Sequence, residues 1–270
     1  MKKILLYVLV IAMLLSTTAF AATNTQINTA DALYSLGLFQ GRGGTAGYAL
    51  DENLTRAEGM ALLIRMIGKD EEVKDKTYNT PFVDVPDWAA GYVGYAYTNK
   101  ITDGMGPDKF GPNVQLSDNM FLTLVLRALG YVDKGENAQF TWDKPYALAK
   151  KIGLISSEAA DKSFTRGEAI VIFWNAMSAK FVGEDMTLAE SLIQQKVFTK
   201  AELQLATDIQ AGKVADVERP AGGIGGSGGS GSGGNDDGGN TGGDTGDNGD
   251  SGAEDTDTDT GLEPDQTPWG

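Results

Sequence analysis

The sequence predicts a mainly α-helical fold, in which three helix-loop-helix repeats form a pseudo-threefold trimer around a central three-helix bundle, followed by a disordered C-terminal tail. Three observations support this prediction. A four-residue helix-start motif occurs three times, each copy preceding a long apolar segment. Apolar residues in these segments recur at three- and four-residue spacings, as in a buried helix. Residues 221–270 contain 18 of the 36 glycines and neither Lys nor Arg, a composition typical of a disordered segment.

Residues 1–21 are expected to be a secretory signal peptide. Two lysines precede an apolar run at residues 4–15, and alanines stand at 19 and 21, which is the order of regions in such a leader. A membrane anchor is the alternative, but 12 apolar residues fall short of the roughly 20 that span a bilayer. We therefore expect a secreted chain, cleaved after residue 21 or 22, with no membrane insertion after cleavage.

The repeated motif is a capping box, which marks the start of a helix. Its copies are Thr55-Arg56-Ala57-Glu58, Ser117-Asp118-Asn119-Met120 and Thr165-Arg166-Gly167-Glu168. In the first and third copies the hydroxyl accepts a hydrogen bond from the amide of the Glu, whose carboxylate bonds back to the Thr amide. The second copy keeps the hydroxyl and loses both Arg and Glu. Within the helices that follow, Arg65, Arg127 and Asn175 fall in register.

Each repeat is expected to begin with a further helix that closes on a turn, upstream of its capping box. These upstream helices are predicted over residues 31–38, 88–101 and 143–154. The repeats themselves are then placed at residues 22–69, 82–131 and 140–181.

The end of the chain is expected to differ from the repeats. Two further capping boxes begin at Thr187 and Thr199, and they predict short helices that close the bundle within residues 182–219. Residues 220–270 are rich in Gly, Ser, Asn and Asp and have few apolar side chains. They are predicted to form a disordered, acidic spacer, because they cannot bury enough apolar surface to offset the entropy of ordering.

Composition excludes several kinds of chemistry. The chain has 22 Lys and Arg against 37 Asp and Glu, a formal net charge of −15, and it contains neither His nor Cys. It therefore cannot form a Ser-His-Asp or Cys-His triad, a Cys/His zinc site or a disulfide. An acidic chain is also a poor nucleic-acid binder, because phosphate contacts need clustered Lys and Arg. Carbohydrate binding, protein binding, oxygen-ligated metal and carboxylate catalysis stay open. No pattern places two acids across a cleft, so we expect neither an enzyme nor a cofactor.

Several segments carry a resemblance to a known family. In the second repeat they are Phe82-Val83-Asp84-Val85, Trp88-Ala89, Ile101-Thr102-Asp103-Gly104 and Phe110-Gly111-Pro112. Together with Thr55-Arg56-Ala57-Glu58, they resemble the S-layer homology (SLH) domain, a triple-repeat module that holds exported proteins on bacterial cell walls. The resemblance implies a non-catalytic anchor at the cell surface, in the cell wall or S-layer. Such an anchor binds pyruvylated secondary cell-wall polysaccharide non-covalently, in grooves between repeats.

Five residues are candidates for ligand binding: Arg56, Arg166, Trp88, Asp103 and Gly104. Both arginines stand at the first position of a helix, where the macrodipole favours an acid. A guanidinium there, beside free helix N–H groups, would suit the carboxylate of a sugar. The alternative is a solvated Arg paired with a nearby acid. Trp88 would form a sugar-stacking wall or anchor its helix in the core. Asp103-Gly104 predicts a turn, and the resemblance also places this loop at the groove.

A surface interaction or assembly protein is the alternative function. In that case the acidic tail or the bundle surface would bind another surface protein or calcium. The repeats depart from the family pattern, because the first lacks the Trp-Ala opening and the third lacks the D-G-x-F-x-P loop. The number of grooves that bind ligand therefore stays open.

Overall fold

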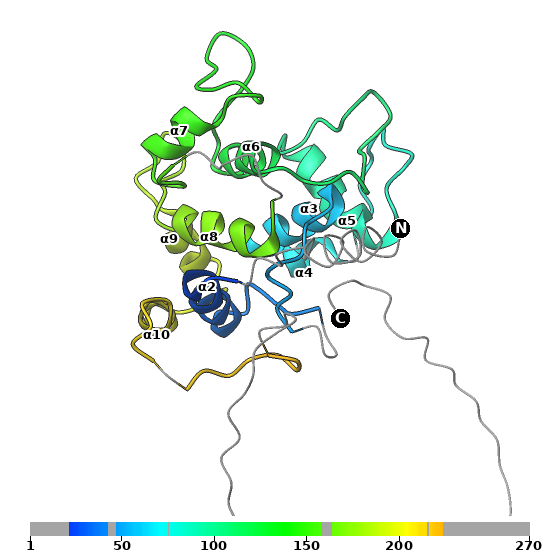
Figure 1. Cartoon of the computed structure of the whole chain (residues 1–270). Coiled ribbons are helices and arrows are strands. Elements are labelled where there is room, and N and C mark those ends of the chain that lie inside the picture. Colours follow the sequence, from blue (N-terminus) through cyan, green and yellow to red (C-terminus); the bar gives the residue numbers. More distant parts are fainter. Residues whose placement is uncertain (1–21, 43–46, 75, 158–163, 215, 224–270) are drawn as a thin grey trace, which may run out of the picture.

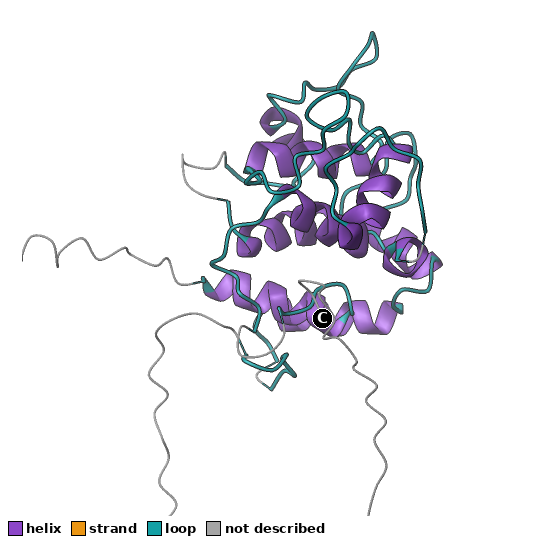
Figure 2. Cartoon of the chain, turned by 90° about the vertical axis from the view of Figure 1, so that its right-hand side faces the viewer, coloured by secondary structure: helices purple, strands orange, loops and turns teal. Residues whose placement is uncertain are grey.

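The computed structural model describes residues 22–42, 47–74, 76–157, 164–214 and 216–223, and this part of the protein consists of helices joined by loops. These residues form nine α-helices and, apart from isolated bridges, no strand, which confirms the mainly α prediction (Figures 1 and 2). None of these helices is both long and apolar enough to cross a membrane. The predicted signal peptide and the predicted tail beyond residue 223 lie outside the described residues. The helices are α2 (Asn24–Ser35), α3 (Arg56–Met66), α4 (Asp70–Val73), α5 (Asp87–Thr98), α6 (Asp118–Ala128), α7 (Tyr146–Lys151), α8 (Arg166–Ala176), α9 (Leu188–Gln194) and α10 (Lys200–Gln210).

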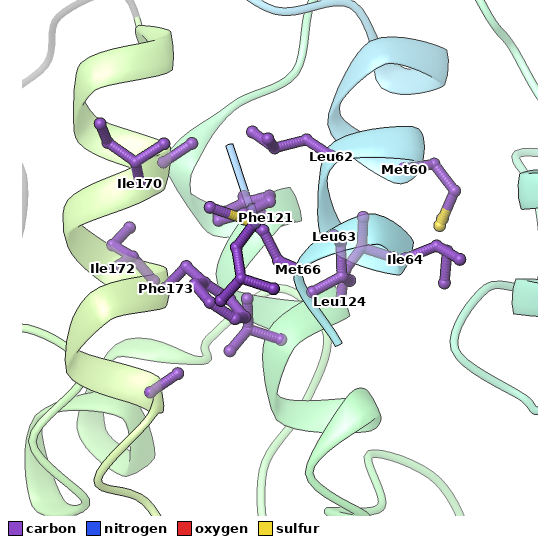
Figure 3. Close-up of a cluster of buried hydrophobic side chains, with 14 of the residues drawn as sticks. Met60, Leu62, Leu63, Ile64, Met66, Phe121, Leu124, Ile170, Ile172 and Phe173 are labelled. Carbon is purple, nitrogen blue, oxygen red and sulfur yellow. The ribbon is translucent and has the colours of Figure 1, made fainter. Parts of the chain in front are cut away.

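Helices α3, α6 and α8 begin at the three copies of the motif. Thr55 and Thr165 form complete capping boxes, and Ser117 caps α6 without the reciprocal half. The three helices contact one another, and their apolar side chains meet in the buried cluster of Figure 3. Removing this apolar surface from water is the main favourable contribution to folding, and it fixes where the three helix starts lie. The pseudo-threefold relation among the repeats stays a prediction.

The upstream helices pack across the predicted repeat boundaries. α5 contacts α3 of the first repeat, α7 contacts α6 of the second, and α2 contacts α8 of the third. Two of the predicted starts are wrong. α2 begins at Asn24 rather than Asp31, because Thr23 and Gln26 form a capping box there, and α7 begins directly after Pro145 rather than at residue 143. Each central helix is therefore covered by an element of the next repeat, which brings loops of one repeat to the helix start of another.

Helices α9 and α10 begin at the predicted capping boxes of Thr187 and Thr199. The prediction of a short helix after Thr199 is wrong, since α10 has 11 residues, as many as α3, α6 and α8. It is nevertheless unlike them, because Ala206 and Ile209 are its buried residues and it packs against α2 (Figure 1). α10 therefore covers the outside of the first repeat.

Beyond α10 the chain returns to the first repeat. Arg219 forms a two-pronged ion pair with the buried Asp31, at 2.8 and 2.7 Å. The Tyr48 hydroxyl donates to the same carboxylate at 3.0 Å, and the Tyr48 amide donates to the carbonyl of Gly223 at 3.1 Å. The folded body therefore extends to residue 223, four residues into the range 220–270 that is predicted to be disordered.

Candidate functional site

The starts of α3 and α8 are held by loops of neighbouring repeats. The amides of Arg56 and Ala57 donate to the carbonyls of Val114 and Pro112, at 2.9 and 3.1 Å. The start of α8 is bound in the same way, since its first two amides donate to carbonyls of residues 52 and 50 at 2.8 and 2.9 Å. The amides at both helix starts are thus already bonded, which corrects the expectation of free N–H groups beside each guanidinium. Any anion bound here would rest on side chains.

Arg56 is a buried cation without an acidic partner. Its Nε donates to the carbonyl of Phe110 at 3.1 Å, and its guanidinium carbon lies 4.9 Å from the centroid of the Phe110 ring. The residue is 7% exposed, and within the described part of the chain it forms no ion pair with a carboxylate. Burial lowers the pKa of Arg56, the nearby Arg127 lowers it further, and Asp84 opposes both. This charge is only partly stabilised by the protein, so it would be stabilised by a ligand anion.

A cavity of about 320 Å³ opens beside Arg56, and we call it the Arg56 groove. It lies between the start of α3, the loop at residues 102–105, one face of α6 and the connection from α6 to α7. Two other predicted residues, Asp103 and Gly104, line it with Arg56. Its size is at the lower end of the range for small-ligand pockets, roughly 300–1,000 Å³.

Two further cations line the groove, and both are paired. Arg127 donates to Asp133 through Nε at 3.0 Å and through Nη2 at 2.6 Å, and the same Nη2 lies 2.8 Å from Asp103. Lys134 Nζ also lies 2.8 Å from Asp103. Burial alone would raise the pKa of Asp103, but its contacts with Lys134 and Arg127 lower it. Asp103 therefore acts as a counterion within the groove, and Arg56 supplies its unpaired positive charge.

Among the charged and aromatic residues that line the groove, sequence reasoning missed three. Arg127 could have been found, because it falls in register with Arg65 and Asn175. Lys134 carried no such signal, since it lies between the second and third predicted repeats. Trp142 lies at the opening of the third predicted repeat, where the sequence matches the family pattern only loosely. Trp142 is one of the residues that line the groove, and it is 59% exposed. The groove thus combines a buried cation with an exposed aromatic ring.

Trp88 and Gly104 have different surroundings. Trp88 is half-buried, packs against the hydrophobic core and does not line the Arg56 groove. Gly104 has a φ of +78°, and a Cβ at this position would stand 2.4 Å from a ring carbon of Phe82. Its backbone therefore has the conformation that a glycine turn requires. The arrangement favours a core role for Trp88 and a loop-shaping role for Gly104.

Arg166 is the counterpart of Arg56, and it is enclosed. Its Nε donates to the carbonyl of Tyr48 at 3.2 Å, Nη2 donates to the carbonyl of Gln40 at 3.2 Å, and its guanidinium carbon lies 5.0 Å from the Phe39 ring centroid. The residue is 0% exposed, and burial lowers the pKa of its guanidinium. A ligand could not reach this side chain without displacing part of the first repeat. Arg166 does not join the other predicted residues in the groove.

A second cavity, of about 520 Å³, lies between the start of α6 and one face of α8. Asp118 occupies the motif position of Arg56, and Asn175 occupies that of Arg127. Among the described residues that line it none is basic, and Glu168 adds a further acid. No group of three or more acids placed to hold a metal ion occurs among the described residues. This cavity therefore lacks, in its described part, the cation that distinguishes the Arg56 groove.

Comparisons with known proteins agree with these motifs. A family model for the S-layer homology domain matches residues 81–117. A cell surface protein of Thermoanaerobacter kivui is 31% identical over 245 residues, which are 81% of this chain and 31% of that protein. A surface layer protein of Brevibacillus choshinensis is 33% identical over 144 residues, 48% of this chain and 13% of the relative. An amylopullulanase of Thermoanaerobacterium thermosulfurigenes is 29% identical over 150 residues, which are 48% of this chain and 8% of that protein. The chain spans less than a third of the length of each of these relatives.

Proposed function

Residues 81–117 belong to the S-layer homology domain family, and on that premise we propose that this chain is a non-catalytic anchoring module of the cell surface. Its ligand is an acidic secondary cell-wall polysaccharide, held non-covalently in the Arg56 groove. The carboxylate of a pyruvylated sugar is the group that Arg56 would bind. The relatives named as a cell surface protein and a surface layer protein support this location.

The single observation that carries the proposal is the state of Arg56. An arginine that is 7% exposed, and whose guanidinium has no carboxylate partner in the described chain, is costly to keep. It lines an open groove, so a ligand anion can reach it. Two planar N–H groups aimed at one carboxylate would form the strong, charge-assisted type of hydrogen bond.

The range of relatives supports a binding role for the shared segment. A surface layer protein and an amylopullulanase are matched by the same share of this chain, 48%, but the match covers 13% and 8% of their own lengths. Similarity of about half of this chain to proteins with such different names is more simply explained by shared attachment than by shared catalysis. The absence of His and Cys from the chain also removes the commonest nucleophile and base pairings.

Co-sedimentation with cell-wall sacculi tests the proposal. The purified protein should pellet with native sacculi and stay in solution with sacculi stripped of their secondary polysaccharide. Arg56→Ala should lose retention by at least about tenfold, as expected for a charge-assisted contact. Lys76→Ala removes an exposed surface cation outside the groove and should bind as the parent protein does. Equal retention by native and stripped sacculi would overturn the proposal.

A further inference from the structure

The connection from α6 to α7 is fastened to the rim of the Arg56 groove at both of its ends. Lys134, near its start, contacts Asp103 at 2.8 Å. Near its end, the Thr123 hydroxyl donates to the carbonyl of Trp142 at 2.9 Å, and Asn119 Nδ2 donates to the carbonyl of Asp143 at 2.8 Å. Thr123 and Asn119 belong to the face of α6 that lines the groove. The backbone of Trp142 is therefore held in place while its indole faces solvent.

Trp142 cannot form the hydrogen bonds that Asp84 forms in the second repeat. Phe82-x-Asp84 and Phe140-x-Trp142 each precede an upstream helix, with Phe82 five residues before the start of α5 and Phe140 six residues before the start of α7. Both phenylalanines are buried. The Asp84 carboxylate accepts hydrogen bonds from the amides of Phe110 and Gly111, at 2.8 and 3.0 Å. An indole cannot accept such bonds. The Trp142 side chain is left 59% exposed, although burying an aromatic ring is favourable by about 1.5–3 kcal/mol.

We propose that Trp142 is the stacking platform of the Arg56 groove, on which the apolar face of a sugar ring lies while the acidic group of that sugar reaches Arg56. This inference rests on the proposed function and deepens it. The groove would thereby select a saccharide unit that carries a carboxylate, in preference to either a neutral sugar or a small free carboxylate. Charge and shape both favour this occupant, because the buried cation demands an anion and the exposed ring demands an apolar surface.

A protein segment is the competing occupant, since an exposed Trp is also common at protein interfaces. A sugar is favoured because the ring and the unpaired Arg56 line the same small cavity, of about 320 Å³. That volume suits one or two sugar units better than a protein surface. Binding of the saccharide probe that does not depend on Trp142 would return the indole to the protein-contact explanation.

The test compares three probes by calorimetry: a methyl glycoside bearing a pyruvate ketal, the same glycoside without the ketal, and pyruvate. Wild-type protein should bind the ketal glycoside most tightly. Trp142→Ala should weaken that binding about tenfold, as truncation of an aromatic anchor does, while Trp142→Phe retains most of it. Val132→Ala, which truncates an exposed apolar residue of the same connection outside the groove, should bind like wild type.

Tryptophan fluorescence distinguishes stacking on the ligand from a purely structural role, because only a ring that contacts the ligand should change its emission on binding. The ketal glycoside should change the emission of the wild-type protein, and Trp142→Phe should remove most of that change while binding persists. If the wild type binds the glycoside, Arg56→Ala loses it, and Trp142→Ala binds as tightly as wild type, the stacking role is wrong and the proposed function stands. If the wild type binds none of the three probes, the acidic-sugar proposal itself is overturned.

Discussion

Arg56 and Arg166 occupy the same position of the same motif, and the structure gives them opposite surroundings. Each donates its Nε to a carbonyl of the loop that packs on its helix start, at 3.1 Å to Phe110 and at 3.2 Å to Tyr48. Each also lies over an aromatic ring, at 4.9 and 5.0 Å from the centroid. Arg56 then faces an open groove, whereas Arg166 is sealed. The motif therefore sets the first contacts of the arginine and does not decide whether a ligand can reach it.

The difference comes from what fills the space in front of each guanidinium. Beside Arg166, the loop of the first repeat supplies Arg42, whose guanidinium contacts Glu52 at 2.9 Å and Glu58 at 3.0 Å. The chain near residue 220 closes against the same loop, since Pro220 Cγ lies 3.0 Å from the place of a Cβ on Gly41. Beside Arg56 the equivalent space is the groove. Whether a ligand could reach the arginine thus depends on residues that differ between repeats.

Replacing each of the two arginines with alanine in turn should show that Arg166 contributes mainly to stability and Arg56 mainly to binding. The loss of stability in Arg166→Ala is the largest effect that we expect. Arg166→Ala should lower the free energy of unfolding by about 3 kcal/mol or more, because it leaves an internal cavity and two buried carbonyls without their donor. Arg56→Ala should lower it by about 1–2 kcal/mol, because the vacated space joins a groove that water fills.

Urea unfolding of both variants, followed by circular dichroism, checks this ranking. The folded fraction of Arg166→Ala should still pellet with wall sacculi, whereas Arg56→Ala should be folded and fail to pellet. Similar losses of stability in the two variants would contradict the distinction between an enclosed and an open arginine.

A charge-conserving substitution of Arg56 tests whether the groove needs the shape of the guanidinium as well as its charge. Arg56→Lys keeps the positive charge and loses the planar fork, so retention on sacculi should fall about three- to tenfold. Arg56→Gln, which removes the charge, should fall further. Thermal denaturation serves as the control, since both variants should melt close to the parent protein. Full retention of Arg56→Lys on sacculi would mean that binding requires only the positive charge at this position.

The starts of α3, α6, α8, α9 and α10 were predictable because capping depends on side chains a few residues apart, whereas the starts of α2 and α7 were predicted wrongly. Thr55 and Thr165 cap as expected, and so do the boxes of α9 and α10. The geometry of the loops was harder to predict from the sequence. Ala49 adopts a φ of +49° where the second repeat has Gly111 at +74°, so the first repeat keeps a similar turn without the glycine that would reveal it in sequence. The sequence reveals a positive-φ turn only where the turn requires a glycine.

The composition of the site was predictable only in part, for a different reason. Arg56, Asp103 and Gly104 come together because motifs mark all three. Lys134 and Trp142 reach the groove through a connection whose path depends on tertiary hydrogen bonds to α6. The burial of Arg166 likewise depends on residues more than 110 positions away along the chain. Such contacts leave no periodic or spacing signal.

The smallest effect expected concerns Asp103, and its sign is the informative quantity. Asp103 neutralises Lys134 and shares Arg127 with Asp133, each through contacts of 2.6–2.8 Å. Asp103→Asn removes one negative charge from the groove, so the affinity for the acidic polysaccharide should rise, by about two- to fivefold at low salt. A direct role of Asp103 in holding the ligand predicts the opposite, a loss of affinity.

Asp108→Asn is the matched control, because it makes the same change of charge at an exposed residue of the same loop outside the groove. It should alter retention far less than Asp103→Asn does. Raising the salt concentration to about 0.5 M should reduce the gain from Asp103→Asn, since screening weakens interactions between charges at exposed sites. A gain that persists unchanged in high salt would show that Asp103 acts by blocking the groove. A loss of affinity in Asp103→Asn at both salt concentrations would establish Asp103 as a ligand contact. The open groove would then bind its sugar through an acid as well as an arginine.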